Sequence, residues 1–208
     1  MAENEFPTVE RARFQDAYAG EAPWDIGKPQ PAFQAAAAII VGSILEAGCG
    51  TGENALFFAG KGHLVTGFDF LEAPILAARR KATERNLPAI FLLKDALKLH
   101  EWTERFDNIL DSGLFHVFSD QDRALYVRGL KTVLKPGGRL LLLCFSEHTP
   151  GTQGPRRVFQ KELLAAFADG WKVESIEPSR FETRPEARMT AFSGEDPKAW
   201  FMVASRAT

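Results

Sequence analysis

Cysteine is scarce in this sequence, and long apolar runs and a charged leader are missing from it. Two cysteines, Cys49 and Cys144, in 208 residues are too few for a disulfide framework, and they lack the spacing of metal ligands. The apolar stretch at residues 35–41 is shorter than the roughly 18 residues that a membrane-spanning helix requires. No charged segment followed by an apolar one opens the chain, as in a secretory leader. We therefore expect a protein of the reducing cytoplasm, with no metal site and no membrane segment.

An excess of either charge is also missing. The formal net charge is -2, and basic residues gather only in short groups, at residues 79–81 and 156–157. Domains that bind nucleic acid carry an extended basic face that attracts phosphates. The sequence therefore predicts that nucleic acid is not a partner of this chain.

What the chain does contain is enough apolar material for a sizeable core, with 45% hydrophobic residues and 17 Phe. A length of 208 residues fits one domain over residues 1–208, given a prior of about 150 residues per domain. Continuous apolar runs alternate with helical patterns, which is typical of an α/β fold with a parallel sheet buried on both faces. Residues up to about Val9 are polar and are predicted to be irregular. Strands are predicted at 44–47, 63–69, 90–93, 106–110, 139–145, 171–177 and 200–206, and helices at 11–18, 32–41, 53–61, 72–86, 119–134 and 160–169.

The stretch ILEAGCGTG at residues 44–52 leads an apolar strand into an acid and three alternate glycines. Glycines allow positive φ angles and let backbone amides meet a ligand directly, so a polar small molecule is the expected guest. The dinucleotide fingerprint places its third glycine one residue later, where this chain has Glu53. A carboxylate suits a pyrophosphate poorly, which disfavours an NAD-dependent oxidoreductase.

Four acids stand at or just beyond the carboxyl ends of the first four predicted strands: Glu46, Asp69, Asp95 and Asp111. In an open α/β sheet ligands bind at that edge. Each acid alone could cap a helix, but the four together indicate a ligand with cationic and diol groups. Asp69 suits a ribose diol, Asp95 with the following amide suits an adenine edge, and Glu46 and Asp111 suit an ammonium group.

A rigid segment rich in proline, PWDIGKPQP at residues 23–31, precedes the first strand. Its prolines and glycine fix an extended path, as in segments that position a ligand. In the alternative, Trp24 only covers the core and Asp25 only caps a turn. Phe14 and Tyr18, four residues apart, share one face of the helix that leads into it.

These motifs, together with LKPGG at residues 134–138, resemble those of class I S-adenosylmethionine-dependent methyltransferases. Residues 23–31 are similar to the entry motif of small-molecule methyltransferases of the thiopurine and halide/thiol groups, and closer still to bacterial heterocyclic toxin methyltransferases. Residues 111–118 and 169–174 resemble the same subgroup. The resemblance implies a Rossmann-like, doubly wound sheet of seven mostly parallel strands, with an antiparallel last strand and helices on both faces.

The resemblance also implies cofactor contacts, with S-adenosylmethionine as donor and S-adenosylhomocysteine as product. In it, residues 48–50 lie against the methionine part, Asp69 holds the ribose and Asp111 helps to fix the amino group. Tyr18 and Trp24 close over the sulfonium, where an aromatic face contributes roughly 0.5–2 kcal/mol. The implied cofactor-binding residues are Tyr18, Trp24, Glu46, Gly48, Cys49, Gly50, Asp69, Phe70, Asp95, Ala96 and Asp111.

Methyl transfer from a sulfonium is an in-line displacement, which needs positioning and exclusion of water more than a covalent nucleophile. His116, just past the fourth predicted strand, is the best candidate for a general base, because the unperturbed pKa of histidine is near 6.5. In the alternative, His116 only shapes the acceptor pocket or holds a loop. His148 is the second candidate.

The acceptor is expected between residues 1–40, which form a cover, and the loops at 146–158 and 179–198. Aromatic residues there predict a flat or apolar acceptor; they include Phe159, Phe181 and Phe192. The expected function is methyl transfer to nitrogen, oxygen or sulfur of a small heterocyclic or aromatic molecule by a monomer or weak homodimer. Alternatives are a thiol or halide methyltransferase and, more distantly, an oxidoreductase or a nonenzymatic cofactor-binding protein.

Overall fold

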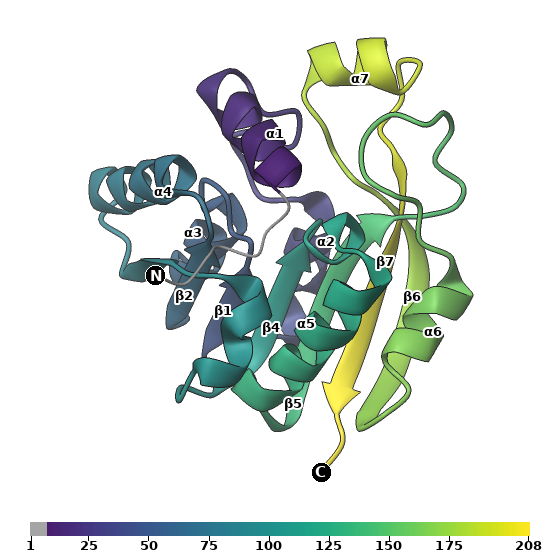
Figure 1. Ribbon diagram of the computed structural model, residues 1–208. Helices are drawn as coiled ribbons and strands as arrows, with labels where there is room; N and C mark the ends of the chain where they lie inside the picture. Colours follow the sequence, from purple (N-terminus) through teal and green to yellow (C-terminus); the bar gives the residue numbers. More distant parts are fainter. Residues whose placement is uncertain (1–7) are drawn as a thin grey trace.

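The computed structural model describes residues 8–208, and a twisted sheet with helices on both faces forms its centre (Figure 1). The part of the predicted irregular segment at residues 1–7 lies outside the described residues, and α1 begins at Thr8. The strands are β1 Ile44–Ala47, β2 Val65–Asp69, β3 Ala89–Leu93, β4 Phe106–Ser112, β5 Leu134–Phe145, β6 Trp171–Arg180 and β7 Lys198–Arg206. The helices are α1 Thr8–Ala19, α2 Pro31–Ala35, α3 Glu53–Ala59, α4 Glu72–Glu84, α5 Asp120–Val133, α6 Gln160–Ala166 and α7 Pro185–Ala191, with short 3₁₀ helices η1 Ala36–Ile39, η2 Ala96–Glu101 and η3 Phe115–Val117.

The sheet has the strand order β3-β2-β1-β4-β5-β7-β6. Strands β1 to β5 pair in parallel, whereas β7 runs antiparallel to both β5 and β6. The predicted seven-stranded, doubly wound sheet with an antiparallel last strand is confirmed. The chain reverses its direction of travel across the sheet between β1 and β4, and such a switch point opens a crevice at the strand ends.

Alternate residues of the central strands face two separate cores. In β5, Leu140 and Leu142 belong to the core that α5, α6 and η2 cover, whereas Leu141 and Leu143 belong to the core under α2, α3 and α4. Successive side chains of a strand point to opposite faces. Burial on both faces explains why these strands are continuous apolar runs in the sequence.

The helix predicted at 32–41 is the short α2 followed by the 3₁₀ helix η1, which ends at Ile39. Two further differences have a clear physical cause. The loop expected at 179–198 contains α7, whose side chains are not buried. Its sequence therefore lacks the apolar periodicity that would predict a helix. Strand β5 begins at Leu134, ahead of the predicted residue 139, because Leu134 already pairs with Phe106 before the register shifts. Both differences lie at element ends or at the surface, where burial leaves little pattern.

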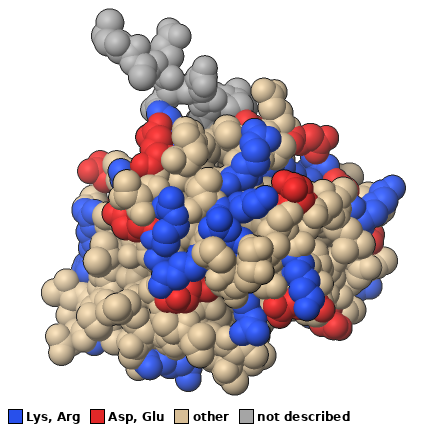
Figure 2. Space-filling model, turned by 90° about the horizontal axis from the view of Figure 1, so that it is seen from below, with Lys and Arg blue, Asp and Glu red and all other residues tan. Residues whose placement is uncertain are grey.

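Helices α1 and α7 and the loop after β5 gather above the upper ends of the parallel strands, which are their carboxyl ends (Figure 1). The opposite end of the sheet is seen in Figure 2, where basic and acidic side chains are interspersed. Ion pairs there include Lys135 with Asp107 and Arg139 with Glu174. Within residues 8–208, no helix is both long and apolar enough to cross a membrane.

Candidate active site

A cavity of about 640 Å³ opens at the carboxyl edge of the sheet. Its walls come from α1, the 23–31 segment, the loops after β1, β2 and β4, and the loops at 146–158 and 179–198. Most of the residues predicted to bind the cofactor lie on these walls: Tyr18, Trp24, Glu46, Gly48, Cys49, Gly50, Asp69, Phe70 and Ala96. The sequence did not single out other lining residues as site residues, among them Gln30, Ser112, Gly113, Leu114, Phe145 and Thr183.

The glycine loop after β1 forms a closely packed cradle at the switch point. Gly48 and Gly50 adopt φ angles of +63° and +51°, a region that residues with a Cβ atom rarely enter. A Cβ atom at Gly50 would lie 2.6 Å from the hydroxyl of Tyr18. Cys49 N–H donates to the carbonyl of Phe68 at 2.8 Å, which ties the cradle to the end of β2.

Glu46, at the third position of β1, is 1% exposed and fixes the start of α3. Its Oε1 accepts a hydrogen bond from Asn54 Nδ2, and its Oε2 accepts one from Ala55 N–H, both at 2.8 Å. Burial raises the pKa of Glu46 to about 7, although these two bonds oppose the shift. The carboxyl therefore braces the floor of the cradle and is poised between its charge states near neutral pH.

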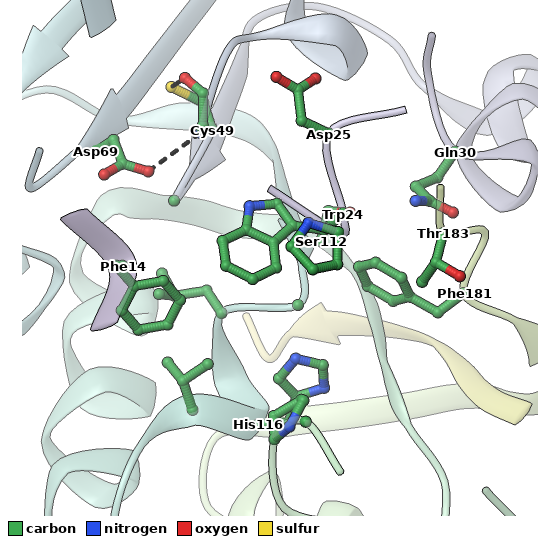
Figure 3. Close-up of a pocket in the computed structure, with 18 of the residues that line it drawn as sticks. Phe14, Trp24, Asp25, Gln30, Cys49, Asp69, Ser112, His116, Phe181 and Thr183 are labelled. Atoms are coloured by element: carbon green, nitrogen blue, oxygen red, sulfur yellow. Dashed lines mark hydrogen bonds between the residues drawn. The ribbon is translucent and has the colours of Figure 1, made fainter. Parts of the chain in front are cut away.

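Asp69 ends β2 and lies directly beside the glycine loop (Figure 3). Its Oδ2 accepts from Gly50 N–H at 3.1 Å, and its Oδ1 accepts from Leu71 N–H at 3.0 Å. The side chain is 6% exposed, and burial raises its pKa to about 6. These contacts hold the carboxyl beside the glycine loop, where a ligand diol can reach it.

Aromatic rings of α1 and the 23–31 segment roof the cavity. Trp24 donates its Nε1–H to Tyr18 Oη at 3.0 Å, and the two rings meet edge to face at 5.8 Å. Phe14 lies 5.5 Å from Trp24 and 5.9 Å from Phe70. The two predicted helix-face rings thus join Trp24 in one cluster, which offers π faces to a cationic ligand group.

Gln30 links the 23–31 segment to α3 and to the loop at 179–198. Its backbone N–H donates to Asn54 Oδ1 at 2.8 Å, which joins it to α3. Its side-chain amide donates to the carbonyl of Glu182 at 2.8 Å and accepts from Glu182 N–H at 2.9 Å. The side chain is 4% exposed. Gln30 belongs to the 23–31 segment that the sequence singles out. Its partner Glu182 lies 152 positions away, so no local pattern predicts this contact.

Asp111 does not fit its predicted role. Its carboxylate is fully buried and lies off the cavity wall. Its oxygens accept bonds from Leu114 N–H at 2.8 Å, from Phe115 N–H at 3.1 Å and from Tyr126 Oη at 2.9 Å. These bonds hold the turn after β4. The Asp111 side chain is therefore occupied by its own turn and lies off the cavity, which argues against the predicted contact with the amino group of a ligand.

Asp95 lies at the margin of the cavity. Its neighbours Lys94 and Ala96 line the wall, whereas Asp95 itself does not. Its Oδ1 accepts from Leu97 N–H at 2.8 Å, so it caps η2. The helix-cap reading applies to this residue, and contact with an adenine edge stays a prediction.

His116, in η3, lies on the cavity wall across from Trp24 and beside Phe181 (Figure 3). Its ring is 4% exposed, and its Nδ1 accepts a hydrogen bond from Phe145 N–H at 2.9 Å. Burial, together with the cations of Arg123 and Arg157, lowers the pKa of His116 to about 3. A ring in this state is a poor general base at neutral pH, which argues against its predicted catalytic role.

The other acceptor-side predictions divide in two. Phe181 and Phe192 are buried on the cavity wall, 5.5 and 5.6 Å from the ring of Phe145. Phe159, by contrast, is 47% exposed and lies away from it. His148 also lies off the wall and packs against Trp200 instead, so neither fits its predicted place.

The described residues include no cluster of three or more histidine, cysteine or acidic side chains able to hold a metal ion. They do fit S-adenosylmethionine. Gly48 and Gly50 bring backbone without a Cβ atom to the cavity wall, and the acids beside them suit a cationic and diol-bearing molecule. The aromatic roof suits a sulfonium.

Comparison with known proteins points the same way. Residues 44–138 match the family described as "Methyltransferase domain". The chain is 32% identical over 211 residues to a 2-heptyl-1-hydroxyquinolin-4(1H)-one methyltransferase of Mycobacteroides abscessus, with 92% of each protein covered. It is 33% identical over 133 residues to probable thiol methyltransferase 2 of Arabidopsis thaliana, covering 61% of this chain and 58% of that protein.

Two solved structures are similar to this chain. One described by "Conversion of a Disulfide Bond into a Thioacetal Group during Echinomycin Biosynthesis" is 36% identical with a TM-score of 0.81, covering 94% of this chain and 92% of its own. Another, the 1,6-didemethyltoxoflavin-N1-methyltransferase of Burkholderia thailandensis with bound 1,6-didemethyltoxoflavin and S-adenosylhomocysteine, is 23% identical with a TM-score of 0.76. It covers 100% of this chain and 92% of its own, and at that identity the likeness concerns the fold.

Proposed function

Because the chain belongs to the class I S-adenosylmethionine-dependent methyltransferases that act on small molecules, we propose that its methyl acceptor is a flat heteroaromatic molecule. The observation that carries this proposal is the division of the cavity. Asp69 and Cys49 of the cradle lie away from Phe181 (Figure 3), and the ring of Phe145 packs against those of Phe181 and Phe192. A relative that is named as a hydroxyquinolone methyltransferase supports the same class of acceptor.

We propose the following roles for the cofactor side. Gly48, Cys49 and Gly50 contact the methionine part, and Asp69 accepts hydrogen bonds from the ribose hydroxyls. Phe70 and Ala96 flank the adenine, with Asp95 at its edge. Glu46 acts through its bonds to α3, because both of its oxygens already accept protein N–H groups.

The bound cofactor supplies a methyl group on an electrophilic sulfonium. The protein's own task is to hold an acceptor atom in line with that methyl and to keep water out. Phe14, Tyr18 and Trp24 close the donor end, and residues 146–158 and 179–198 bring Pro155, Phe181 and Phe192 to the acceptor end. We further propose that residues 1–208 act as one domain, in the cytoplasm, as a monomer or weak homodimer.

Transfer of a labelled methyl group tests this proposal. The purified chain is incubated with methyl-labelled S-adenosylmethionine and panels of hydroxy-heterocycles, phenols, thiols and halides. We expect turnover with at least one planar heteroaromatic compound. A preference for small thiols or halides would instead favour the second candidate, which the likeness to probable thiol methyltransferase 2 supports.

Removal of the Trp24 ring is expected to weaken cofactor binding. Trp24→Ala takes away the face that we place beside the sulfonium and the donor to Tyr18. A cation–π contact of roughly 0.5–2 kcal/mol corresponds to a 2- to 30-fold loss of affinity. Calorimetry with S-adenosylmethionine measures it. Phe159→Ala, at an exposed ring off the cavity, serves as the control and is expected to bind normally.

Cofactor affinity is also expected to rise with pH through about 6. Burial raises the pKa of Asp69 to about 6, so at pH 5 most of the free protein carries a proton on this carboxyl. Hydrogen bonds from ribose hydroxyls favour the charged form, and binding is therefore weaker where the proton must first leave. For one such group the affinity falls roughly tenfold from pH 7 to pH 5.

The dissociation constant of S-adenosylhomocysteine, measured by calorimetry across this range, checks the expectation. Asp69→Asn is expected to bind more weakly and to lose most of the slope. A wild-type affinity that stays constant from pH 5 to pH 7 contradicts the role given to Asp69.

A further inference from the structure

The two nitrogens of His116 have different surroundings. Nδ1 accepts a hydrogen bond from the backbone N–H of Phe145 at 2.9 Å. A backbone amide nitrogen can only donate, so Nδ1 carries no proton. A neutral imidazole has one proton, which must then reside on Nε2. The backbone of β5 thereby selects the tautomer of His116.

Nε2 is directed to the cavity. It has no hydrogen-bond partner among the side chains described, at residues 11–208. Within that range, a side-chain nitrogen or oxygen that is both fully buried and unpartnered occurs only at Arg123 Nη2, so Nε2 keeps some exposed surface. Nε2 also lies 3.2 Å from the position that a Cβ atom would take at Gly113, another residue of the wall. An N–H donor is thus available to whatever occupies the acceptor side.

The charges around the ring oppose a second proton. The charged groups that act on it are Arg123 from α5 and Arg157 from the loop after β5, and both are cations. The guanidinium of Arg157 lies 5.6 Å from the centre of the Phe145 ring. The same positive potential that keeps His116 neutral favours a negative charge on a bound molecule.

Among the side chains that the structure describes, the acids lining the cavity stand in or beside the glycine cradle rather than near His116. The cavity's buried acids, Glu46 and Asp69, belong to the glycine cradle, and each of their oxygens accepts a hydrogen bond. Asp25 Oδ1 accepts a hydrogen bond from the hydroxyl of Thr51, which belongs to the glycine loop. The walls around His116 are the rings of Phe145 and Phe181, which meet it at 5.0 and 6.0 Å.

We propose that His116 is a hydrogen-bond donor, whose neutral Nε2–H binds the anionic oxygen or nitrogen of a heteroaromatic acceptor that enters the cavity already deprotonated. The inference rests on the proposed function and narrows its substrate class to acidic hydroxy- or NH-heterocycles. The acceptor loses its proton to solvent before it binds. Its lone pair then forms the bond to the methyl carbon while the sulfur–carbon bond breaks, and that electron pair stays on sulfur, which leaves both products neutral at the reacting atoms.

Nitrogen NMR of the histidine rings in the wild-type protein tests the tautomer without turnover. Signals of His116, assigned by their loss in His116→Gln, are expected to show a neutral ring with the proton on Nε2 from pH 5 to pH 8. A ring protonated on Nδ1, or one that titrates between pH 5.5 and 8, overturns the proposal.

The pH profile of kcat/KM tests the substrate class. For acceptors of graded acidity, the profile is expected to break at the acceptor's own pKa and to move with it. A break at one fixed pH for all acceptors, lost in His116→Gln, identifies His116 as a base and overturns the proposal.

Substitution supplies the third readout. His116→Phe is expected to lower kcat/KM about 10- to 100-fold, as for a lost hydrogen bond to a charged group, whereas His116→Gln, which keeps an N–H donor, retains more activity. His148→Gln, off the cavity, is the matched control. S-adenosylhomocysteine binding shows that each variant is folded. If no heteroaromatic compound is methylated by wild type, the proposed function fails. The NMR measurement still tests whether His116 is neutral with its proton on Nε2.

Discussion

Gly50→Ala is expected to lose S-adenosylhomocysteine binding by roughly 100-fold. The new Cβ atom would lie 2.6 Å from the Tyr18 hydroxyl, at a φ angle of +51°. Overpacking of a tight site costs about 1–3 kcal/mol, and 2.7 kcal/mol corresponds to a 100-fold loss of affinity. The Tyr18 side chain can rotate away, but it then no longer accepts the Trp24 hydrogen bond and the roof opens.

Gly62→Ala is the matched control for this change. Gly62 has a φ angle of +90°, and a Cβ atom there would meet nothing within 4 Å. It also lies off the cavity. Both variants carry similar backbone strain, so a difference in calorimetric affinity isolates the cradle. Equal affinities in the two variants contradict the placement of the cofactor against Gly50.

Asp111→Ala is expected to destabilise the protein by about 3–5 kcal/mol without any direct contact with the cofactor. The substitution leaves the buried donors Leu114 N–H, Phe115 N–H and Tyr126 Oη without their acceptor. Each buried donor left unpaired costs about 1–3 kcal/mol. Thermal unfolding is expected to show a loss of roughly 10 °C in Tm.

The loss of stability caused by Asp111→Ala is expected to depend on pH. Burial raises the pKa of Asp111 to about 6, above its unfolded value. The part of its contribution that depends on protonation is therefore fully present below about pH 4 and is lost as the pH rises through 6. The gap in Tm between wild type and Asp111→Ala should narrow across that range. Tyr126→Phe, which removes one donor, should cost less, and Asp169→Ala, at an exposed side chain, should leave Tm nearly unchanged.

Strand parity explains why one acid was assigned wrongly from the sequence. In the parallel pairing of β1 and β4, Ala47 is level with Asp111, and Glu46 is level with Leu110. Residues level with each other point to the same face. Glu46 therefore faces α3 and Asp111 faces α5, so their side chains cannot share one ammonium group. The alternation was present in the sequence, but the register between strands was not.

The fold itself was largely predictable, because strands buried on both faces are continuous apolar runs between helical patterns. The role of His116 was not. Its tautomer depends on Phe145 N–H, which lies 29 positions away and belongs to a neighbouring strand. Likewise, α7 carries no buried side chain, and nothing in its sequence period marks it. Local pattern identifies which residues approach the carboxyl edge, while their hydrogen-bond partners depend on tertiary packing.

A calorimetric titration of the wild-type chain with S-adenosylhomocysteine, alongside one with NADH, tests the central claim most directly. The claim is that the cradle at residues 48–50 and Asp69 form the site of a methyl donor. We predict saturable binding of S-adenosylhomocysteine at one site per chain and no binding heat with NADH. Binding of NADH without binding of S-adenosylhomocysteine would contradict it.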